Sequence, residues 1–194
     1  MDQLNLNSIL KRENEEKMFI NCLMDFEKNK LDIMTKRGIY IYGNPGSGKT
    51  MFVKNILKKL NYDILLFDAG DIRNKSIIEN IAKYNMPDTN IMSLFQKKII
   101  KKAIIMDEID GMNSGDKGGI NSLIKLIRPK KTKKQKKEAC TMIPIICIGN
   151  YHIDKKIKEL MKVCDIIELK MPTQNQIKQI ASLLMKKIDI ALIE

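Results

Sequence analysis

The 194-residue sequence lacks the features that mark membrane-spanning and secreted proteins. No apolar run approaches the roughly 20 residues that a membrane-spanning helix needs, so no contact with a membrane is expected. The N-terminal stretch MDQLNLNSILKRENEE contains no basic segment followed by an apolar one. A secretory signal is therefore not expected either.

Cysteine and histidine are too few and too scattered for a structural zinc site. The cysteines are Cys22, Cys140, Cys147 and Cys164, no two of which form a CxxC pair, and the single His152 has no HxxxH partner. Cys147 lies in an apolar run, which predicts a buried, small hydrophobic residue. We expect a reducing, intracellular environment with no disulfide bond and no structural metal.

What the sequence has in excess is positive charge. Lysine and arginine number 35 against 23 acidic residues, a net charge of +12. Such a balance favours a polyanionic partner, most often nucleic acid. The alternative is that the lysines reflect solubility and a Lys-rich codon bias.

Half of the net charge falls in one segment, residues 128–138, with the sequence RPKKTKKQKKE and a net charge of +6. One hypothesis is that this segment contacts DNA phosphates, and the other is a solvated loop without a partner. The candidate DNA-binding residues are Lys130, Lys131, Lys133, Lys134, Lys136 and Lys137.

Apolar segments alternate between strand-like runs and helical spacing along the chain. The predicted strands are 38–42, 62–67, 103–106, 142–148 and 165–169, and the predicted helices are 7–30, 49–60, 75–84, 90–101, 119–127, 155–163 and 174–187. Continuous apolar strands that alternate with helices predict an α/β fold, with a parallel sheet covered by helices on both faces.

A glycine-rich segment follows the first strand. Residues 43–50, GNPGSGKT, fit the pattern G-x-x-x-x-G-K-[ST] between a strand and an amphipathic helix. Glycines let backbone N–H groups curl around a phosphate, and the helix N-terminus adds a positive dipole end. Lys49 is expected to reach the β- and γ-phosphates of ATP, and the Thr50 hydroxyl to ligate Mg²⁺. The predicted nucleotide-binding residues are Gly43, Asn44, Pro45, Gly46, Ser47, Gly48, Lys49, Thr50 and Met51.

Two later strands end in polar residues. The strand at 103–106 leads directly to Asp107, expected to hold Mg²⁺, and to Glu108, expected to polarise the attacking water. The strand at 142–148 leads to Asn150, expected to contact the γ-phosphate or that water, because ligands bind at the carboxyl ends of strands in open α/β sheets. The alternatives are acidic residues that exit into solvent and an ordinary Asn turn.

At these motifs the chain resembles the AAA+ ATPases, with a Walker A motif at 43–50, a Walker B motif at 104–110 and a sensor 1 Asn at position 150. Finer similarities point to the clamp loaders and, within them, to the large subunit of replication factor C. They are DAGDIRNKS at 68–76, DEIDGM at 107–112, DKGGI at 116–120, IPIICIGN at 143–150 and MPTQNQI at 171–177. Asp68 and Gly70 depart from the family pattern, and the resemblance covers roughly residues 38–190.

The resemblance implies a three-layer P-loop NTPase fold with a helical lead-in at 1–37, an ATP-binding core at 38–171 and the incomplete start of a helical lid at 172–194. It implies an ATPase that needs partner subunits for full activity and that uses ATP and Mg²⁺ to load a sliding clamp onto primer–template DNA in replication. The implied catalytic residues are Lys49, Asp107, Glu108 and Asn150. The implied partners are paralogous clamp-loader subunits, the clamp and DNA, in the nucleus or at a viral replication site.

One departure favours the large-subunit interpretation. Small clamp-loader subunits carry a Ser-Arg-Cys motif whose arginine acts on a neighbour's ATP, whereas residues 162–164 here are Lys-Val-Cys. Two alternatives remain open. Arg12-Glu13 before a helix resembles origin-recognition and helicase-loading AAA+ ATPases, and a non-hydrolysing DNA-binding module with a structural ATP site would carry the same P-loop.

Overall fold

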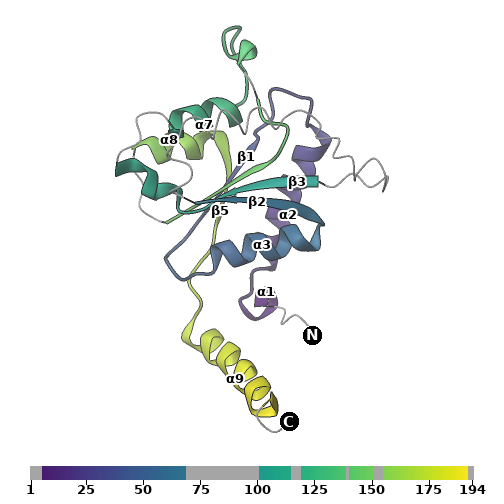
Figure 1. The fold of residues 1–194 in the computed structure, drawn as a ribbon, viewed down its shortest axis with the longest axis vertical. Coiled ribbons are helices and arrows are strands. Elements are labelled where there is room, and N and C mark those ends of the chain that lie inside the picture. Colours follow the sequence, from purple (N-terminus) through teal and green to yellow (C-terminus); the bar gives the residue numbers. More distant parts are fainter. Residues whose placement is uncertain (1–5, 69–100, 115–118, 139, 151–154, 192–194) are drawn as a thin grey trace.

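The computed structural model describes residues 6–68, 101–114, 119–138, 140–150 and 155–191 (Figure 1). The strands are β1 (Gly38–Tyr42), β2 (Tyr62–Phe67), β3 (Lys101–Met106), β4 (Ile145–Gly149) and β5 (Cys164–Glu168). The helices are α1 (Leu6–Ile9), α2 (Glu13–Lys28), α3 (Lys49–Lys59), α7 (Gly119–Ile127), α8 (Lys155–Val163) and α9 (Gln174–Ala191), with 3₁₀ helices η1 (Ile109–Ser114) and η2 (Gln135–Lys137).

Several predicted elements and residues lie outside the described part of the chain. They include the predicted helix at 75–84, most of the segment at 68–76, the first three residues of 116–120, and His152. The same holds for the predicted helix at 90–101, apart from Lys101, which begins β3.

The five described strands form one sheet in the order β2-β3-β4-β1-β5, and every pair of neighbours is parallel. Tyr42, the last residue of β1, is in register with Gly149 of β4 and Glu168 of β5. The loops that follow these strands therefore leave from the same edge of the sheet, as the α/β prediction requires.

Helices α2 and α3 cover one face of the sheet (Figure 1). Their apolar positions recur at helical spacing, so each helix buries one side against the strands. The buried helix residues on this face are Phe19, Leu23, Phe52, Val53, Ile56 and Leu57, packed on Ile39, Ile41, Ile105, Ile146, Ile148 and Ile167 of the strands. The N-terminal helix α2 is thus part of the three-layer fold.

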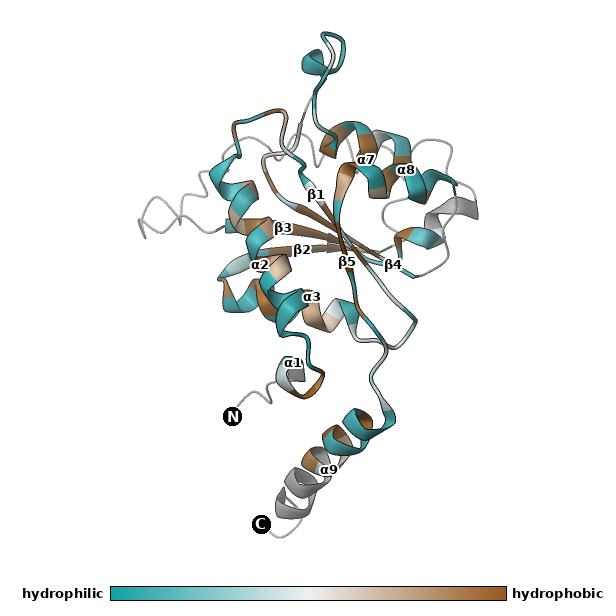
Figure 2. Cartoon of the chain, turned by 180° about the vertical axis from the view of Figure 1, so that it is seen from behind, coloured by the Kyte–Doolittle hydropathy of each residue, from teal (hydrophilic) through white to brown (hydrophobic). Residues whose placement is uncertain are grey.

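Helices α7 and α8, with η1, cover the opposite face. Buried residues here are Ile109, Ile120, Leu123, Leu126, Ile127, Ile157 and Leu160, packed on Tyr40, Ile104, Met106, Ile145, Cys147 and Cys164. Cys147 is fully buried, as predicted. Hydrophobic strands lie between helices whose outer sides are hydrophilic (Figure 2), so the predicted three-layer α/β fold is confirmed.

Two strands begin two or more residues away from their predicted starts. β3 begins at Lys101, because Lys101 and Lys102 continue the parallel register opposite Tyr62 and Asp63 despite their charge. β4 begins at Ile145 instead of residue 142, after a turn in which the Thr141 hydroxyl contacts the backbone of Ile143.

The predicted helix at 7–30 is two helices, α1 and α2. Lys11 has φ 53°, in the left-handed region that interrupts an α-helix, and the Arg12 N–H donates to the Asn7 carbonyl across this turn. The turn directs the Arg12 side chain into the protein, where it is 5% exposed.

Helix α9 follows β5 and extends away from the sheet (Figure 1). It begins two residues after Pro172, where the sequence predicts the boundary of a lid, and that domain boundary stays a prediction. Among the described residues, no helix combines the length and the apolar character needed to cross a bilayer.

Candidate nucleotide-binding site

The loop between β1 and α3 has the backbone of a phosphate-binding loop. Gly46 and Gly48 have φ angles of 77° and 81°, in the left-handed region where a side chain is strained. Gly48 immediately precedes α3, so the loop ends at the helix N-terminus, where free N–H groups and the helix dipole favour an anion.

The Lys49 ammonium lies over this loop. Its Nζ donates to the carbonyls of Gly43 (3.1 Å) and Asn44 (3.0 Å) and to Oδ1 of Asn150 (3.1 Å). The residue is only 9% exposed, and burial lowers the pKa of its ammonium, while nearby Asp110 and Asp107 oppose that shift. The cation is thus fixed between the loop and the carboxyl end of β4.

Thr50 and Asp107 meet although 57 positions separate them. The Thr50 hydroxyl donates to Oδ2 of Asp107 at 2.7 Å. Asp107 is held from two further sides, since its N–H donates to the Phe67 carbonyl (2.8 Å) and its Oδ1 accepts from the Glu108 N–H (3.0 Å). Two oxygen side chains expected to ligate Mg²⁺ therefore lie side by side.

Glu108 has φ 51°, an uncommon conformation for a residue with a side chain. Its carboxylate is exposed at the pocket. Such strain persists only where the surroundings hold it, and it is frequent at functional sites. The turn after β3 thus separates two adjacent acids, with Asp107 hydrogen-bonded and Glu108 free to face solvent.

Asn150 connects Lys49 with Asp110, which the sequence analysis did not single out. Its Nδ2 donates to Oδ2 of Asp110 at 2.8 Å, while its Oδ1 accepts from Lys49. In the described part of the chain, the other Asp110 oxygen is buried without a hydrogen bond. The signal that could have identified Asp110 is its place three residues after Asp107, within one turn of η1.

These side chains surround a single cavity of about 370 Å³ at the carboxyl edge of the sheet. Its lining includes Pro45, Gly46, Gly48, Lys49, Thr50, Met51, Asp107, Glu108, Asp110 and Asn150. The predicted residues Gly43, Asn44 and Ser47 are not part of this lining. Gly43 and Asn44 offer carbonyls to Lys49, and Ser47 is buried.

Arg12 supports the loop from outside the cavity and was also missed as a site residue. Its Nη2 donates to the Ser47 carbonyl (2.7 Å) and to the Lys170 carbonyl (2.9 Å). Burial lowers the pKa of the guanidinium, opposed by Glu15. One cation therefore joins the N-terminal turn, the phosphate-binding loop and the segment that leads to α9.

The donor chemistry of the cavity fits a magnesium–nucleotide complex. Hydroxyl and carboxylate oxygens, as in Thr50 and Asp107, are the ligands that Mg²⁺ prefers. A buried ammonium and a loop of backbone N–H groups suit phosphate oxygens. These residues come from the ends of β1, β3 and β4, where ligands bind in open α/β sheets.

The lysine-rich segment does not join this site. It precedes β4 and so lies at the amino edge of the sheet, opposite the cavity. Lys130 does not belong among the candidate DNA-binding residues, because its side chain is folded inward and is 1% exposed. The other five lysines are exposed.

Residues 39–171 match the family described as AAA, the ATPase family associated with various cellular activities. The chain is 31% identical over 149 residues to replication factor C subunit 1 of Saccharomyces cerevisiae and 34% over 142 residues to replication factor C subunit 1 of Homo sapiens. It is 23% identical over 160 residues to the replication factor C large subunit of Pyrobaculum aerophilum.

These alignments cover 73, 70 and 82% of this chain but only 16, 11 and 34% of the three relatives. The chain thus spans a small part of the proteins that it is similar to. The family match, by contrast, covers more than half of the chain and contains the whole cavity apart from its Arg12 support. This chain belongs to the AAA family of ATPases, and its similarity to the large subunits of replication factor C agrees with the resemblance drawn from its motifs.

Proposed function

We propose that this chain binds and hydrolyses ATP as one subunit of a clamp-loader-like complex. The observation that carries the proposal is the meeting of Lys49, Thr50 and Asp107 around one cavity at the carboxyl edge of a parallel sheet. These residues come from two motifs far apart in the sequence. Their meeting supports a site built for a nucleoside triphosphate and not a glycine-rich turn without a ligand.

Binding rests on the loop and its lysine. Lys49 contacts the β- and γ-phosphates, and the loop N–H groups surround the same oxygens. Thr50 and Asp107 hold Mg²⁺, which when bound neutralises charge on the phosphates. Met51, exposed beside the loop, contributes apolar surface to the cavity wall.

Hydrolysis rests on Glu108 and Asn150. The Glu108 carboxylate orients a water and accepts its proton as the water attacks the γ-phosphorus, while the bond from that phosphorus to the bridging oxygen breaks and ADP leaves. Asn150 is fixed on both sides, by Lys49 and by Asp110, so its amide keeps a defined orientation toward the γ-phosphate or that water.

The chain alone is expected to turn over slowly. Val163 ends α8 at the position where the small clamp-loader subunits carry their arginine. A cationic group supplied by a neighbour in phosphoryl transfer raises the rate by about 10³–10⁵ in systems where it is measured. Steady turnover at full rate by the purified chain would show that it needs no partner.

The clamp-loader assignment is supported by the similarity to proteins named replication factor C subunit 1 and by the net charge of +12. In this role, ATP binding orders the chain against paralogous subunits around primer–template DNA, and hydrolysis releases the sliding clamp. Contacts with DNA then follow the charge and shape of the backbone, not the base sequence.

The test is purification of the tagged chain, in the presence of ATP, from the organism that encodes it. We expect paralogous AAA subunits and a ring-forming clamp to be recovered and identified by mass spectrometry. A Glu108→Gln variant, which retains ATP, should increase the yield of the assembly. Recovery of replicative helicase or origin-binding proteins without a clamp would favour the origin-recognition alternative and contradict the proposal.

A further inference from the structure

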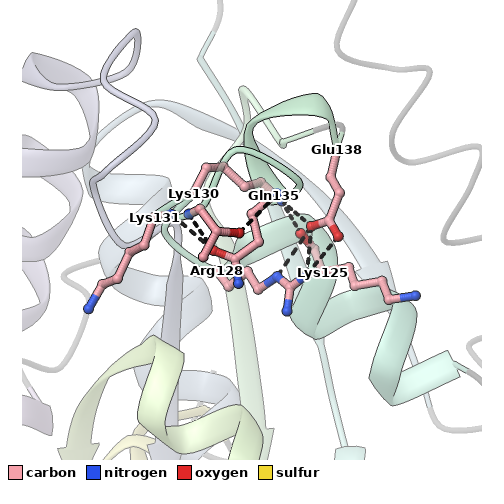
Figure 3. Close-up of polar contacts among 7 residues, drawn as sticks. Lys125, Arg128, Lys130, Lys131, Gln135 and Glu138 are labelled. Carbon is pink, nitrogen blue, oxygen red and sulfur yellow. Dashed lines mark hydrogen bonds and ion pairs between the residues drawn. The ribbon is translucent and has the colours of Figure 1, made fainter.

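The lysine-rich segment between α7 and β4 is closed at its base by an ion pair (Figure 3). Arg128 Nη2 donates to both carboxylate oxygens of Glu138, at 2.6 and 2.8 Å, and its Nε donates to Oε2 at 3.2 Å. Hydrogen bonding from Arg128 lowers the pKa of Glu138, which favours the ionised carboxylate. The two ends of the segment are therefore held together by a forked, charge-assisted contact.

Lys130 closes the base from inside. Its N–H donates to the Ile33 carbonyl at 2.8 Å, and its ammonium contacts the Lys125 carbonyl and, at 3.4 Å, Oε2 of Glu138. The neighbouring loop is fixed too, since buried Arg37 donates to the Thr141 carbonyl. The base of the segment is thus held by hydrogen bonds from the buried Lys130 and by the half-buried Arg128–Glu138 ion pair.

The tip of the segment is ordered by hydrogen bonds within the segment, from the Gln135 side chain and from the backbone. Oε1 of Gln135 accepts from the N–H groups of Lys131 (3.0 Å) and Thr132 (3.1 Å), and the Lys136 N–H donates to the Thr132 carbonyl (3.0 Å). Gln135 and Lys136, which make these bonds, belong to the short helix η2. The tip is therefore a defined turn, in contrast to the solvated loop that composition alone permits.

Five lysines project from this turn. They are Lys131, Lys133, Lys134, Lys136 and Lys137, and all are exposed. Residues 129–137 contain no acidic residue, and Glu138, the nearest acid in sequence, is occupied at the base by Arg128. The projection is visible beyond the end of α7, on the side away from α9 (Figure 1). The turn thus carries five positive charges without a neighbouring acid in its own segment.

We propose that this turn, residues 131–137, is a preorganised binding surface for the phosphate backbone of nucleic acid. The choice of nucleic acid among polyanions rests on the proposed function. A membrane surface suits the turn less, because residues 130–137 contain no apolar side chain to enter a bilayer. The site is separate from the nucleotide cavity, since the two lie at opposite edges of the sheet.

Preorganisation distinguishes this surface from a merely charged tail. Side chains on a fixed turn lose less conformational freedom on binding than those on a flexible loop. Each lysine that contacts a phosphate releases condensed counterion, with a log–log salt slope of about −0.9 per contact on duplex DNA. The proposal therefore makes affinity depend on the base contacts as well as on charge.

The first measurement is the affinity of the full chain for a short, mixed-sequence duplex, by fluorescence anisotropy at salt between ~50 and ~200 mM. Substituting the five exposed lysines by Gln should flatten the salt slope by up to about 4.5 units. The matched control replaces five exposed lysines elsewhere, Lys17, Lys28, Lys58, Lys158 and Lys162. Equal slopes for the turn variant and the wild type, or equal losses in the turn variant and the control, would overturn the proposal.

The second measurement separates order from charge through Glu138→Gln. This change removes a negative charge, so simple attraction predicts tighter binding, whereas loss of the closed base predicts weaker binding by roughly threefold or more. The double variant Arg128→Gln/Glu138→Gln keeps the net charge and should also bind more weakly. Unchanged or tighter binding by both variants would contradict the preorganised turn.

Two further probes test the ligand class and isolate the proposed function. The full chain is also tested against phosphatidylserine vesicles and polyglutamate. If it binds either of them more tightly than the duplex, and the five lysines are needed for that binding, the assignment to nucleic acid is overturned. The same variants should retain ATP binding, because the cavity is remote. If the wild type fails to bind ATP, the proposed function fails. If the wild type binds ATP but the variant without the five lysines binds DNA as tightly as the wild type does, this inference alone fails.

Discussion

The Thr50 hydroxyl donates a 2.7 Å hydrogen bond to the Asp107 carboxylate and so connects the first turn of α3 with the end of β3. The contact brings a hydroxyl oxygen of the first motif next to a carboxylate oxygen of the second motif. Both oxygens are ligands of the type that Mg²⁺ accepts, so their separate contributions can be tested by substitution.

Thr50→Val keeps the shape of the side chain and removes its hydroxyl. We expect the variant to lose most of the Mg²⁺-dependent gain in ATP affinity, because one metal ligand is gone, while binding in EDTA changes little. A hydrogen bond or ligand contact to a charged group contributes on the order of 1.5–3 kcal/mol, or roughly 10- to 100-fold in affinity. Titration of a fluorescent ATP analogue with and without Mg²⁺ measures this, and an unchanged response to Mg²⁺ would exclude Thr50 as a ligand.

Lys49→Ala should weaken ATP binding by roughly 10- to 100-fold, because the variant loses one charged contact to the phosphates. Lys58→Ala provides the matched control, since Lys58 lies on the same helix and is exposed. Equilibrium titration of both variants gives the comparison. Wild-type affinity in Lys49→Ala would remove the residue from the phosphate site.

Glu108→Gln should bind ATP normally and lose turnover by about 10²-fold or more, because the amide cannot accept a proton from water as the carboxylate does. The assay is phosphate release by the assembly purified with its partners, together with nucleotide binding by the same sample. Turnover at the wild-type rate would assign proton transfer to another group.

Arg12→Met should lower ATP affinity although Arg12 lies outside the cavity lining. The variant keeps the apolar stem but leaves the Ser47 and Lys170 carbonyls without the guanidinium, at a cost on the order of 1–3 kcal/mol for a buried unsatisfied group. Lys11→Met removes an adjacent, exposed charge and serves as the control. ATP affinity is measured at a temperature well below the Tm of the variant, so that a fall in affinity does not reflect unfolding. Wild-type affinity with only a lower Tm would limit Arg12 to a structural role.

Sequence patterns predicted the strands whose residues are buried without a break. The apolar runs that became β1, β3 and β4 are enclosed by helices, so hydrophobicity and length identified them. The glycine-rich loop after β1 and the polar residues after β3 and β4 located the cavity. Asp107 and Asn150 could be placed at one edge because parallel strands end together.

Contacts between distant residues could not be predicted in this way. The break at Lys11 depends on the carbonyls that Arg12 reaches, and these belong to segments 35 and 158 positions away. In the sequence, Lys130 looks the same as the exposed lysines beside it. Its burial is favourable only because the Lys125 carbonyl and the Glu138 carboxylate contact its ammonium. Asp110 was missed because its role depends on the orientation of the Asn150 amide.

The arrangement of α7 has a thermodynamic consequence for the two edges of the sheet. Its first residue, Gly119, lies on the side of the strands' carboxyl ends, and its last, Ile127, leads directly to Arg128 at the base of the lysine turn. Two ligands bound at these edges do not compete for space, so any dependence between them is a coupling free energy carried by the elements that separate them. Such coupling is reciprocal: the factor by which ATP changes the affinity for DNA equals the factor by which DNA changes the affinity for ATP. If neither α7 nor any other element between the two edges changes when one ligand binds, that factor is one, and the domain would hold the two proposed ligands independently.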